Sequence, residues 1–272
     1  MYHFGWFSTG RGKGSRELFK VALNGIKSGQ IKNAAISYVF CSREPGESPE
    51  TDQFIELVKS NGIPIICFSY QKFKGDRPDN DVDEPLPEWR LEYDRYVMEL
   101  INDFRSDLCV LAGYMLIVGK EMCQKYNMLN LHPAAPGGPK GTWREVIWQL
   151  INAKAKETGV MLHMVTPELD KGPVVSYCKF PIIGKTFDEY WQAIAGKTAD
   201  EIKTTQGEEN ELFKTIRENG LKREFPLILT TMAAFSSGKV VISDGRVFDS
   251  NGNTINGYNL KEEIEKLLKD KN

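Results

Sequence analysis

The chain carries FGWFSTGRGKGS at residues 4–15. The first half is an apolar run that predicts a buried strand, and the alternating glycines of the second half predict a tight turn. Residues 16–28 then repeat apolar side chains at the spacing of one helix face. A strand, a glycine turn and an amphipathic helix in this order predict the opening unit of an α/β fold.

Apolar runs and helical stretches keep alternating along the chain. Further strands are predicted at 33–41, 63–68, 107–112, 128–132, 159–165 and 174–183, and helices at 52–60, 88–105 and 143–153. Residues 69–87 are polar and contain prolines, which predicts a surface loop. In the helix at 88–105 the apolar stripe consists of Tyr96, Val97, Leu100, Ile101 and Phe104. The alternation predicts an α/β fold whose mostly parallel sheet has helices on both faces and binds ligands beyond the carboxyl ends of its strands.

The pattern changes at about residue 186. Helical stretches lead to a helix near 225–234, a hairpin follows around Asp244-Gly245, and a charged helix closes the chain at about 260–270. We therefore predict two domains. Residues 1–185 form the α/β domain, and residues 186–272 form a C-terminal extension of helices, a β-hairpin and a final helix.

Composition restricts the partners and the compartment. The 272 residues are 41% hydrophobic and carry a net charge of -2, so no global basic field is available for a nucleic-acid backbone. The apolar runs all fall short of the roughly 18 residues that cross a bilayer. Five cysteines without a close pair favour reduced thiols, and three histidines without tight Cys/His spacing argue against zinc. We expect a cytoplasmic protein with no metal, nucleic-acid or membrane partner.

A candidate oxyanion site lies at residues 130–133, Asn-Leu-His-Pro, where the strand predicted at 128–132 ends. Residues i and i+2 of a strand share a face, so Asn130 and His132 project together. An amide donor beside an imidazole suits attack on a carbonyl through a tetrahedral oxyanion. The pair alone has a structural explanation too, in which Asn130 caps a turn and His132 is a half-buried, hydrogen-bonded residue.

A carboxylate lies in the turn at residues 166–173, Thr-Pro-Glu-Leu-Asp-Lys-Gly-Pro, between two predicted strands. Asp170 could orient a histidine and accept a proton there. Considered alone, a simple Asp-x-Gly turn accounts for the same residues.

Together, Asn-x-His-Pro and, about 38 residues later, Glu-Leu-Asp-x-Gly-Pro-Val resemble the folate-dependent formyltransferase family. The branch that the chain resembles most is the phosphoribosylglycinamide formyltransferases. The likeness begins at 6–10, includes Val-Leu-Ala-Gly-Tyr-Met at 110–115 and continues through 159–181. It therefore covers roughly residues 4–185.

The resemblance implies a Rossmann-like fold and a formyl donor, 10-formyltetrahydrofolate. In that family a substrate amine attacks the formyl carbon directly, without a metal or a covalent enzyme intermediate. The matching positions imply that Asn130 donates to the formyl oxygen and that protonated His132 stabilises the oxyanion. They also imply that Asp170 holds the imidazolium and helps to remove the amine proton, through water.

Two binding segments are implied as well. The pterin pocket of the family matches loop residues with backbone carbonyls that can accept from the pterin: Met115, Leu116, Ile117, Val118, Thr166, Glu168 and Leu169. The loop for the substrate phosphate matches Gly12, Lys13, Gly14 and Ser15, with Arg11 or Arg16 adding charge. Considered alone, residues 115–118 would be plain core and the glycine loop a solvent-facing turn. His163 matches a position beside the catalytic group, and a buried structural histidine is an equal alternative.

The chain departs from the family beside the acceptor. Residues 134–143 replace the family's Ser-Leu-Leu-Pro, and the phosphate loop is about two residues longer and more basic. The acceptor is therefore open among small phosphorylated amines, with glycinamide ribonucleotide of purine biosynthesis favoured. Glu218 and Glu224 are both candidates for the contact to the acceptor amine. The oligomeric state is also open, with a homodimer as one option.

Other functions remain as alternatives. A sugar-nucleotide amine formyltransferase and a formyltetrahydrofolate hydrolase fit the same motifs. A methionyl-tRNA formyltransferase is disfavoured, because residues 186–272 carry more acidic than basic side chains. An NADP-dependent oxidoreductase is a remote alternative: Gly10-x-Gly12-x-Gly14 follows a strand, but the spacing differs from Gly-x-Gly-x-x-Gly. A non-catalytic folate or nucleotide sensor would have no need of Asn130, His132 and Asp170.

Overall fold

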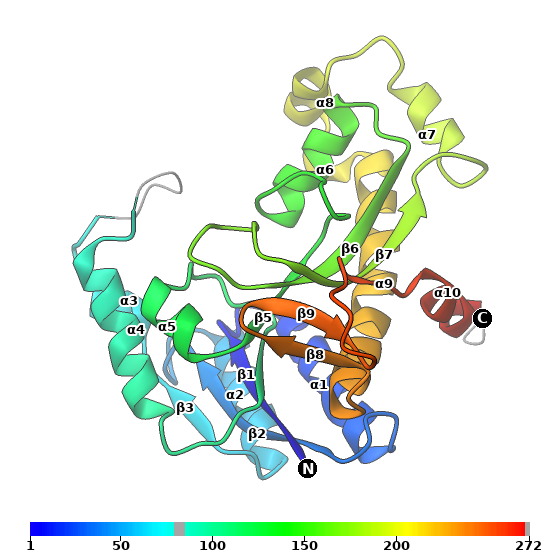
Figure 1. Ribbon diagram of the computed structural model, residues 1–272. Coiled ribbons are helices and arrows are strands. Elements are labelled where there is room, and N and C mark those ends of the chain that lie inside the picture. Colours follow the sequence, from blue (N-terminus) through cyan, green and yellow to red (C-terminus); the bar gives the residue numbers. More distant parts are fainter. Residues whose placement is uncertain (79–84, 270–272) are drawn as a thin grey trace. The chain divides into compact units, whose positions relative to one another are not determined.

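The computed structural model describes residues 1–78 and 85–269, and its elements are labelled in Figure 1. The chain forms two compact units, each assembled from separate stretches. Unit 1 contains Met1–Asn130, Met164–Pro173 and Met232–Thr254, and unit 2 contains Leu131–His163, Val174–Thr231 and Ile255–Asn272. The boundary between residues 185 and 186 that we drew from the sequence stays a prediction.

Unit 1 is built on parallel strands in the order β3-β2-β1-β4-β5. Their bounds are β1 Tyr2–Ser8, β2 Ala34–Cys41, β3 Ile65–Cys67, β4 Leu108–Leu111 and β5 Met128–His132, of which the last two residues belong to unit 2. Gly5 on β1 is required by packing, because an added Cβ would lie 2.6 Å from the hydroxyl oxygen of Tyr38 on β2.

Helices cover both faces of these strands. They are α1 Lys13–Lys27, α2 Pro49–Ser60, α3 Tyr70–Lys74, α4 Glu88–Leu100 and α5 Lys120–Lys125. The ring of Trp6 on β1 packs against Phe19 of α1, which in turn packs against Phe54 of α2. The next side chain, Phe7, faces the opposite way and joins the cluster that contains Tyr93 of α4. The predicted mostly parallel sheet with helices on both faces is confirmed.

Unit 2 contains an antiparallel pair, β6 Glu157–Met164 with β7 Val174–Pro181, and a short strand β10 Tyr258–Asn259 parallel to β7. The last residue of β6, Met164, belongs to unit 1. The helices of unit 2 are α6 Trp143–Asn152, α7 Asp188–Ala193, α8 Ala199–Thr205, α9 Glu211–Ser236 and α10 Lys261–Lys269, with a 3₁₀ turn at Gly207–Glu209. The last five residues of α9 belong to unit 1. The core of this unit joins Ile151 of α6 and Phe180 of β7 to Phe213 and Ile216 of α9.

Several predicted elements change where local chemistry or packing overrides the pattern. Helix α2 begins at Pro49, before the predicted residue 52, because the Ser48 hydroxyl caps it by accepting from the Thr51 N–H. The predicted surface loop at 69–87 is wrong at Tyr70–Lys74, which form α3. The rest of that prediction at residues 79–84, and residue 270 of the predicted final helix, lie outside the described residues.

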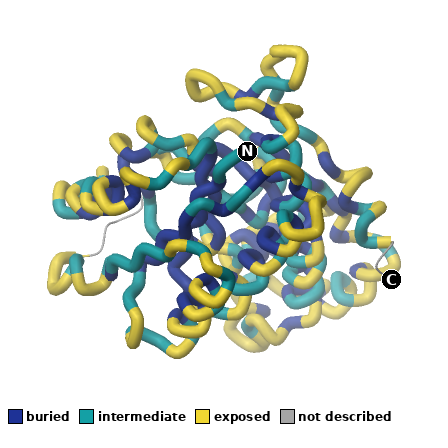
Figure 2. The backbone as a smooth tube through the Cα atoms, turned by 90° about the horizontal axis from the view of Figure 1, so that it is seen from below, coloured by how far each residue is buried: buried dark blue, intermediate teal, exposed yellow. Residues whose placement is uncertain are grey.

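The predicted apolar stripe of α4 is wrong at two positions. Tyr96 is 51% and Leu100 45% exposed, whereas Val97 and Ile101 are buried as expected. The buried face instead includes Arg90 and Asp94, which pair with each other inside the unit. Figure 2 colours the chain by burial, and buried, intermediate and exposed residues follow one another along its helical segments.

The hairpin predicted around Asp244-Gly245 is confirmed as β8 Val240–Ser243 and β9 Arg246–Asp249. Both turn residues have positive φ, 47° and 69°, as a two-residue hairpin turn requires. Within residues 1–78 and 85–269, none of the helices combines the length and the apolar character needed to cross a bilayer.

Candidate active site

The glycine loop leads from the carboxyl end of β1 into the start of α1. Gly12 occupies the N-cap position, no described side chain caps this helix start, and its first turn carries no acidic residue. Lys13 is exposed, whereas Ser15 is buried. The first N–H groups of α1 therefore keep their donor capacity and the positive end of the helix dipole, which together suit an anion.

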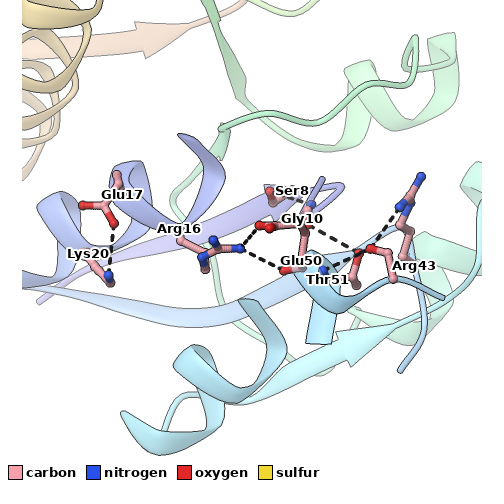
Figure 3. A network of polar contacts seen from close by, with 9 residues as sticks. Ser8, Gly10, Arg16, Glu17, Lys20, Arg43, Glu50 and Thr51 are labelled. Carbon is pink, nitrogen blue, oxygen red and sulfur yellow. Dashed lines mark hydrogen bonds and ion pairs between the residues drawn. The ribbon is translucent and has the colours of Figure 1, made fainter. Parts of the chain in front are cut away.

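Neighbouring side chains hold this loop in place (Figure 3). The Gly10 N–H donates to the Ser8 hydroxyl at 3.2 Å, and the Thr51 hydroxyl of α2 donates to the Gly10 carbonyl at 3.4 Å. Arg16, one of the two arginines that could add charge, instead pairs with the Glu50 carboxylate. Arg11 is exposed and stays the candidate for additional positive charge.

A second loop, residues 113–119, follows β4 and contains the predicted pterin segment 115–118. Gly113 starts it with φ +70°, and an added Cβ there would lie 2.7 Å from the Ser15 hydroxyl. The loop therefore begins in contact with the glycine loop. The side chain of Val118 is buried in the core cluster, so that residue offers a ligand only its backbone.

Two residues that the sequence analysis missed hold the far end of this loop. Arg90 and Asp94, 1% and 2% exposed, face each other one turn apart on α4 at 2.6 Å. Arg90 also donates to the Ile117 carbonyl, and Asp94 accepts from the Gly119 N–H at 2.6 Å. Burial acts to lower the pKa of the Arg90 guanidinium, but the Asp94 carboxylate outweighs it and the pKa is raised. The available signal was two opposite charges four residues apart within an otherwise apolar helix face.

The turn that carries Asp170 is closed at its base. The Met164 N–H donates to the Pro173 carbonyl at 2.9 Å, and the Val165 N–H donates to the Met128 carbonyl of β5 at 2.8 Å. Only glycine fits at position 172, because an added Cβ would lie 1.8 Å from the Met164 carbonyl oxygen. Asp170 itself has φ +52°, a conformation that Asp and Asn tolerate better than most residues.

Both residues of the Asn-x-His pair lie on β5, as predicted. Asn130 is half-buried and pairs in register with Leu111 of β4. His132 is buried and its Nε2–H donates to the Pro139 carbonyl at 2.9 Å. Since a carbonyl can only accept, this bond requires the proton on Nε2. The rings of His132 and His163 lie edge to face, with their centroids 6.0 Å apart.

The predicted residues are thus distributed over both units. Unit 1 carries Asn130, the 166–170 turn with Thr166, Glu168, Leu169 and Asp170, the pterin segment and the glycine loop. Unit 2 carries His132, His163 and both acceptor-contact candidates, of which Glu224 pairs with Arg217 at 2.7 Å and Glu218 is exposed. The convergence of His132 with Asn130 and Asp170 stays a prediction. Among the described residues no cluster of three His, Cys, Asp or Glu side chains is arranged to hold a metal ion.

Comparison with known proteins gives these residues a family. The sequence profile described as formyl transferase matches residues 12–202. A phosphoribosylglycinamide formyltransferase of Dictyostelium discoideum is 30% identical over 155 residues, which are 53% of this chain and 71% of that protein. One of Schizosaccharomyces pombe is 28% identical over 185 residues, 64% of this chain and 80% of that protein.

Solved structures share the fold. A phosphoribosylglycinamide formyltransferase from Coxiella burnetii superposes with a TM-score of 0.66 at 18% identity, over 95% of this chain and 98% of that one. Glycinamide ribonucleotide transformylase 1 from Symbiobacterium toebii superposes with a TM-score of 0.63 at 20% identity, over 91% and 93%. The family profile spans more than half of the sequence. This chain therefore belongs to the folate-dependent formyltransferase family, which is the family that its motifs predicted.

Proposed function

We propose that this chain transfers the formyl group of 10-formyltetrahydrofolate to the primary amine of a small phosphorylated acceptor, with glycinamide ribonucleotide as the favoured acceptor. The observation that carries the proposal is the joint presence, in a formyltransferase, of the Asn-x-His strand end and an uncapped, basic helix start after β1. The relatives' names, which specify phosphoribosylglycinamide formyltransferase, support the same acceptor.

In the proposed mechanism the acceptor nitrogen forms a bond to the formyl carbon, which becomes tetrahedral and carries an oxyanion. Asn130 donates to that oxygen and protonated His132 stabilises its charge. Asp170 stabilises the imidazolium and takes the proton that leaves the amine, through water. Collapse of the intermediate breaks the bond from the formyl carbon to N10 of the folate, and N10 leaves with the proton that the amine gave up, which Asp170 returns through the same water.

We place the pterin between the 115–118 segment and Thr166, Glu168 and Leu169. The exposed side chain of Met115 and the half-buried Leu116 and Ile117 offer an apolar edge, and the turn offers backbone acceptors. Val118 contributes backbone alone. Pterins carry an amino group and ring N–H groups, which such carbonyls can bind.

The acceptor phosphate is placed at Gly12, Lys13, Gly14 and Ser15. An added Cβ at Gly12 or at Gly14 would meet no described atom within 4 Å, so packing does not demand these glycines. Close approach of backbone N–H groups to an anion does explain them.

A formyl-transfer assay with three acceptors tests the function. Purified protein and 10-formyltetrahydrofolate are combined with glycinamide ribonucleotide, with an amino-sugar nucleotide, or with water alone, and loss of the formyl donor is followed. We expect transfer to glycinamide ribonucleotide at least about tenfold faster than to the others. Preferred transfer to the amino-sugar nucleotide, or release of formate in water alone, would replace the proposed acceptor by one of the two alternatives.

The setting of the reaction is part of the proposal. All five cysteines lie in the described part of the chain and are free thiols, which supports a cytoplasmic location. We assign formyl-transfer chemistry to residues 1–185, because the family profile covers most of them, and assign no catalytic residue to the extension at 186–272. Because the chain belongs to the formyltransferase family, we no longer consider an NADP-dependent oxidoreductase as an alternative function. Light scattering decides whether the enzyme is a homodimer.

A further inference from the structure

Thr9 lies at the junction of the two loops that the proposed function uses. It directly follows β1 and precedes the glycine loop, and its side chain is turned toward the loop that starts at Gly113. The residue is 7% exposed. It is none of the residues to which we assign substrate contact.

Three hydrogen bonds fix Thr9 at this position. Its N–H donates to the Gly113 carbonyl at 3.0 Å. Its hydroxyl oxygen accepts from the Met115 N–H at 3.0 Å and from the Ser42 hydroxyl at 3.1 Å. Two of these bonds join Thr9 to the start of the loop at 113–119, called the pterin loop below, whose Met115 is 106 positions away along the chain.

The Met115 N–H depends on this hydroxyl for its place. The side chain of Met115 is 54% exposed, so little packing holds the residue from outside. The far end of the loop is held separately, at the Ile117 carbonyl by Arg90 and at the Gly119 N–H by Asp94. Loss of the Thr9 hydroxyl would therefore release the near end of the loop and leave a backbone donor without a partner.

The glycine loop has its own anchors. Gly10 is bonded to Ser8 through its N–H and to Thr51 through its carbonyl, and neither bond involves the Thr9 side chain. The hydroxyl of Thr9 thus acts on the loop after β4 and leaves the phosphate loop in place.

We propose that Thr9 is a positioning residue for formyl transfer, which sets the start of the pterin loop through the Met115 N–H and thereby determines the affinity for the folate donor. This inference rests on the proposed function. Its consequence is selective, because the affinity for the phosphorylated acceptor is set by a loop with different anchors.

Steady-state kinetics of Thr9→Val and Thr9→Ser tests the inference. Valine keeps the shape of threonine but cannot accept a hydrogen bond, whereas serine keeps the hydroxyl. We expect Thr9→Val to raise KM for 10-formyltetrahydrofolate about tenfold, the loss expected for one buried hydrogen bond. The acceptor KM should stay within about twofold, and Thr9→Ser should restore the donor KM to within about twofold of wild type. A merely structural role would lower thermal stability without separating the two KM values.

Ser42→Ala is the matched control, because it removes the other donor to the same hydroxyl and leaves the Met115 bond intact. The KM of the Ser42→Ala variant for 10-formyltetrahydrofolate should stay near that of wild type. If Thr9→Val fails to fold, the double variant Thr9→Val/Ser42→Ala carries the test, since it leaves one fewer buried donor without a partner. An unchanged donor KM in a folded valine variant, or an equal defect in Thr9→Ser, would overturn the inference.

Direct binding separates this inference from the proposed function. Calorimetry measures the Kd of 10-formyltetrahydrofolate alone, for wild type and for each variant. If wild type neither binds this donor nor transfers its formyl group, the proposed function fails. If wild type binds and transfers normally and the valine variant does the same, the role of Thr9 alone is refuted.

Discussion

At the scale of single residues, the proposed chemistry depends on two groups whose surroundings allow clean substitution. Asp170 adopts φ +52°, which asparagine also tolerates, so Asp170→Asn removes the charge without a change of backbone. His132→Gln can keep an N–H donor for the Pro139 carbonyl but cannot be protonated. We expect each variant to lower kcat by about 10²–10⁴ and to leave the Kd for 10-formyltetrahydrofolate within about threefold. Turnover near wild type in either variant, measured by formyl release, would exclude the proposed roles.

Cysteine reactivity provides a second prediction at this scale. Cys41 and Cys67 are register partners on β2 and β3, and the hydrogen bond from Cys41 lowers the pKa of the Cys67 thiol. Burial raises the pKa of Cys109, and raises that of Cys123 to about 12 and that of Cys178 to about 11. Because the thiolate is the nucleophile, iodoacetamide at pH 7.5 should label Cys67 first. Peptide mass spectrometry over a time course checks the order, and earlier labelling of Cys123 or Cys178 would contradict it.

At the scale of elements, the start of α1 is expected to bind the acceptor. Lys13→Ala should raise KM for glycinamide ribonucleotide about threefold to tenfold with little change in kcat, because it weakens a bound-anion contact that is present throughout the reaction. Lys20→Ala is the control on the same helix, where the lysine is exposed and pairs with Glu17 at 3.0 Å. Equal KM values for glycinamide ribonucleotide in the two variants would contradict an anion site at the start of α1.

Helix α4 allows a comparison between a buried and an exposed ion pair. Asp94→Ala leaves the Arg90 guanidinium charged and unpaired inside unit 1, and should lower the free energy of unfolding by about 3–5 kcal/mol. Arg95→Ala, one residue along, removes ion pairs to Glu88 and Glu121 at the surface and should leave stability nearly unchanged. Urea unfolding of both variants measures the difference, and a similar small effect in both would show that the buried pair is dispensable.

The sequence allowed prediction of those elements and residues whose signal is local. The strand, glycine turn and helix at 4–28 follow from periodicity, and the Asn-x-His motif lies on β5 as expected. The buried face of α4 was missed, because two opposite charges four residues apart also fit a solvent-exposed ion pair until the partners of Arg90 and Asp94 at Ile117 and Gly119 are known. The contact of Thr9 with Met115 was equally hidden, since no periodic pattern relates positions 106 residues apart.

At the scale of the whole molecule, catalytic motifs and packing divide the chain differently. The motifs lie before residue 186, but both compact units take residues from after it. In unit 2 the ring of Trp148 on α6 packs against that of Phe213 on α9, with the ring centroids 4.8 Å apart, and Ile216 lies in the same cluster. In unit 1 Phe235 packs against Tyr2 of β1 at 6.4 Å. Neither core is complete without the C-terminal extension.

A truncated chain tests this dependence. We expect the fragment 1–185 to lack a cooperative thermal transition, because Leu212, Phe213 and Ile216 are missing and the apolar face of α6 is left in water. Its tryptophan emission should shift to longer wavelength, since Trp148 loses its aromatic neighbour. In the full chain, Phe213→Ala should cost about 3–5 kcal/mol of unfolding free energy and keep the native far-ultraviolet circular dichroism spectrum, which would show that the loss comes from packing in the core. A fragment that melts cooperatively and transfers formyl groups would instead establish residues 1–185 as an independent domain.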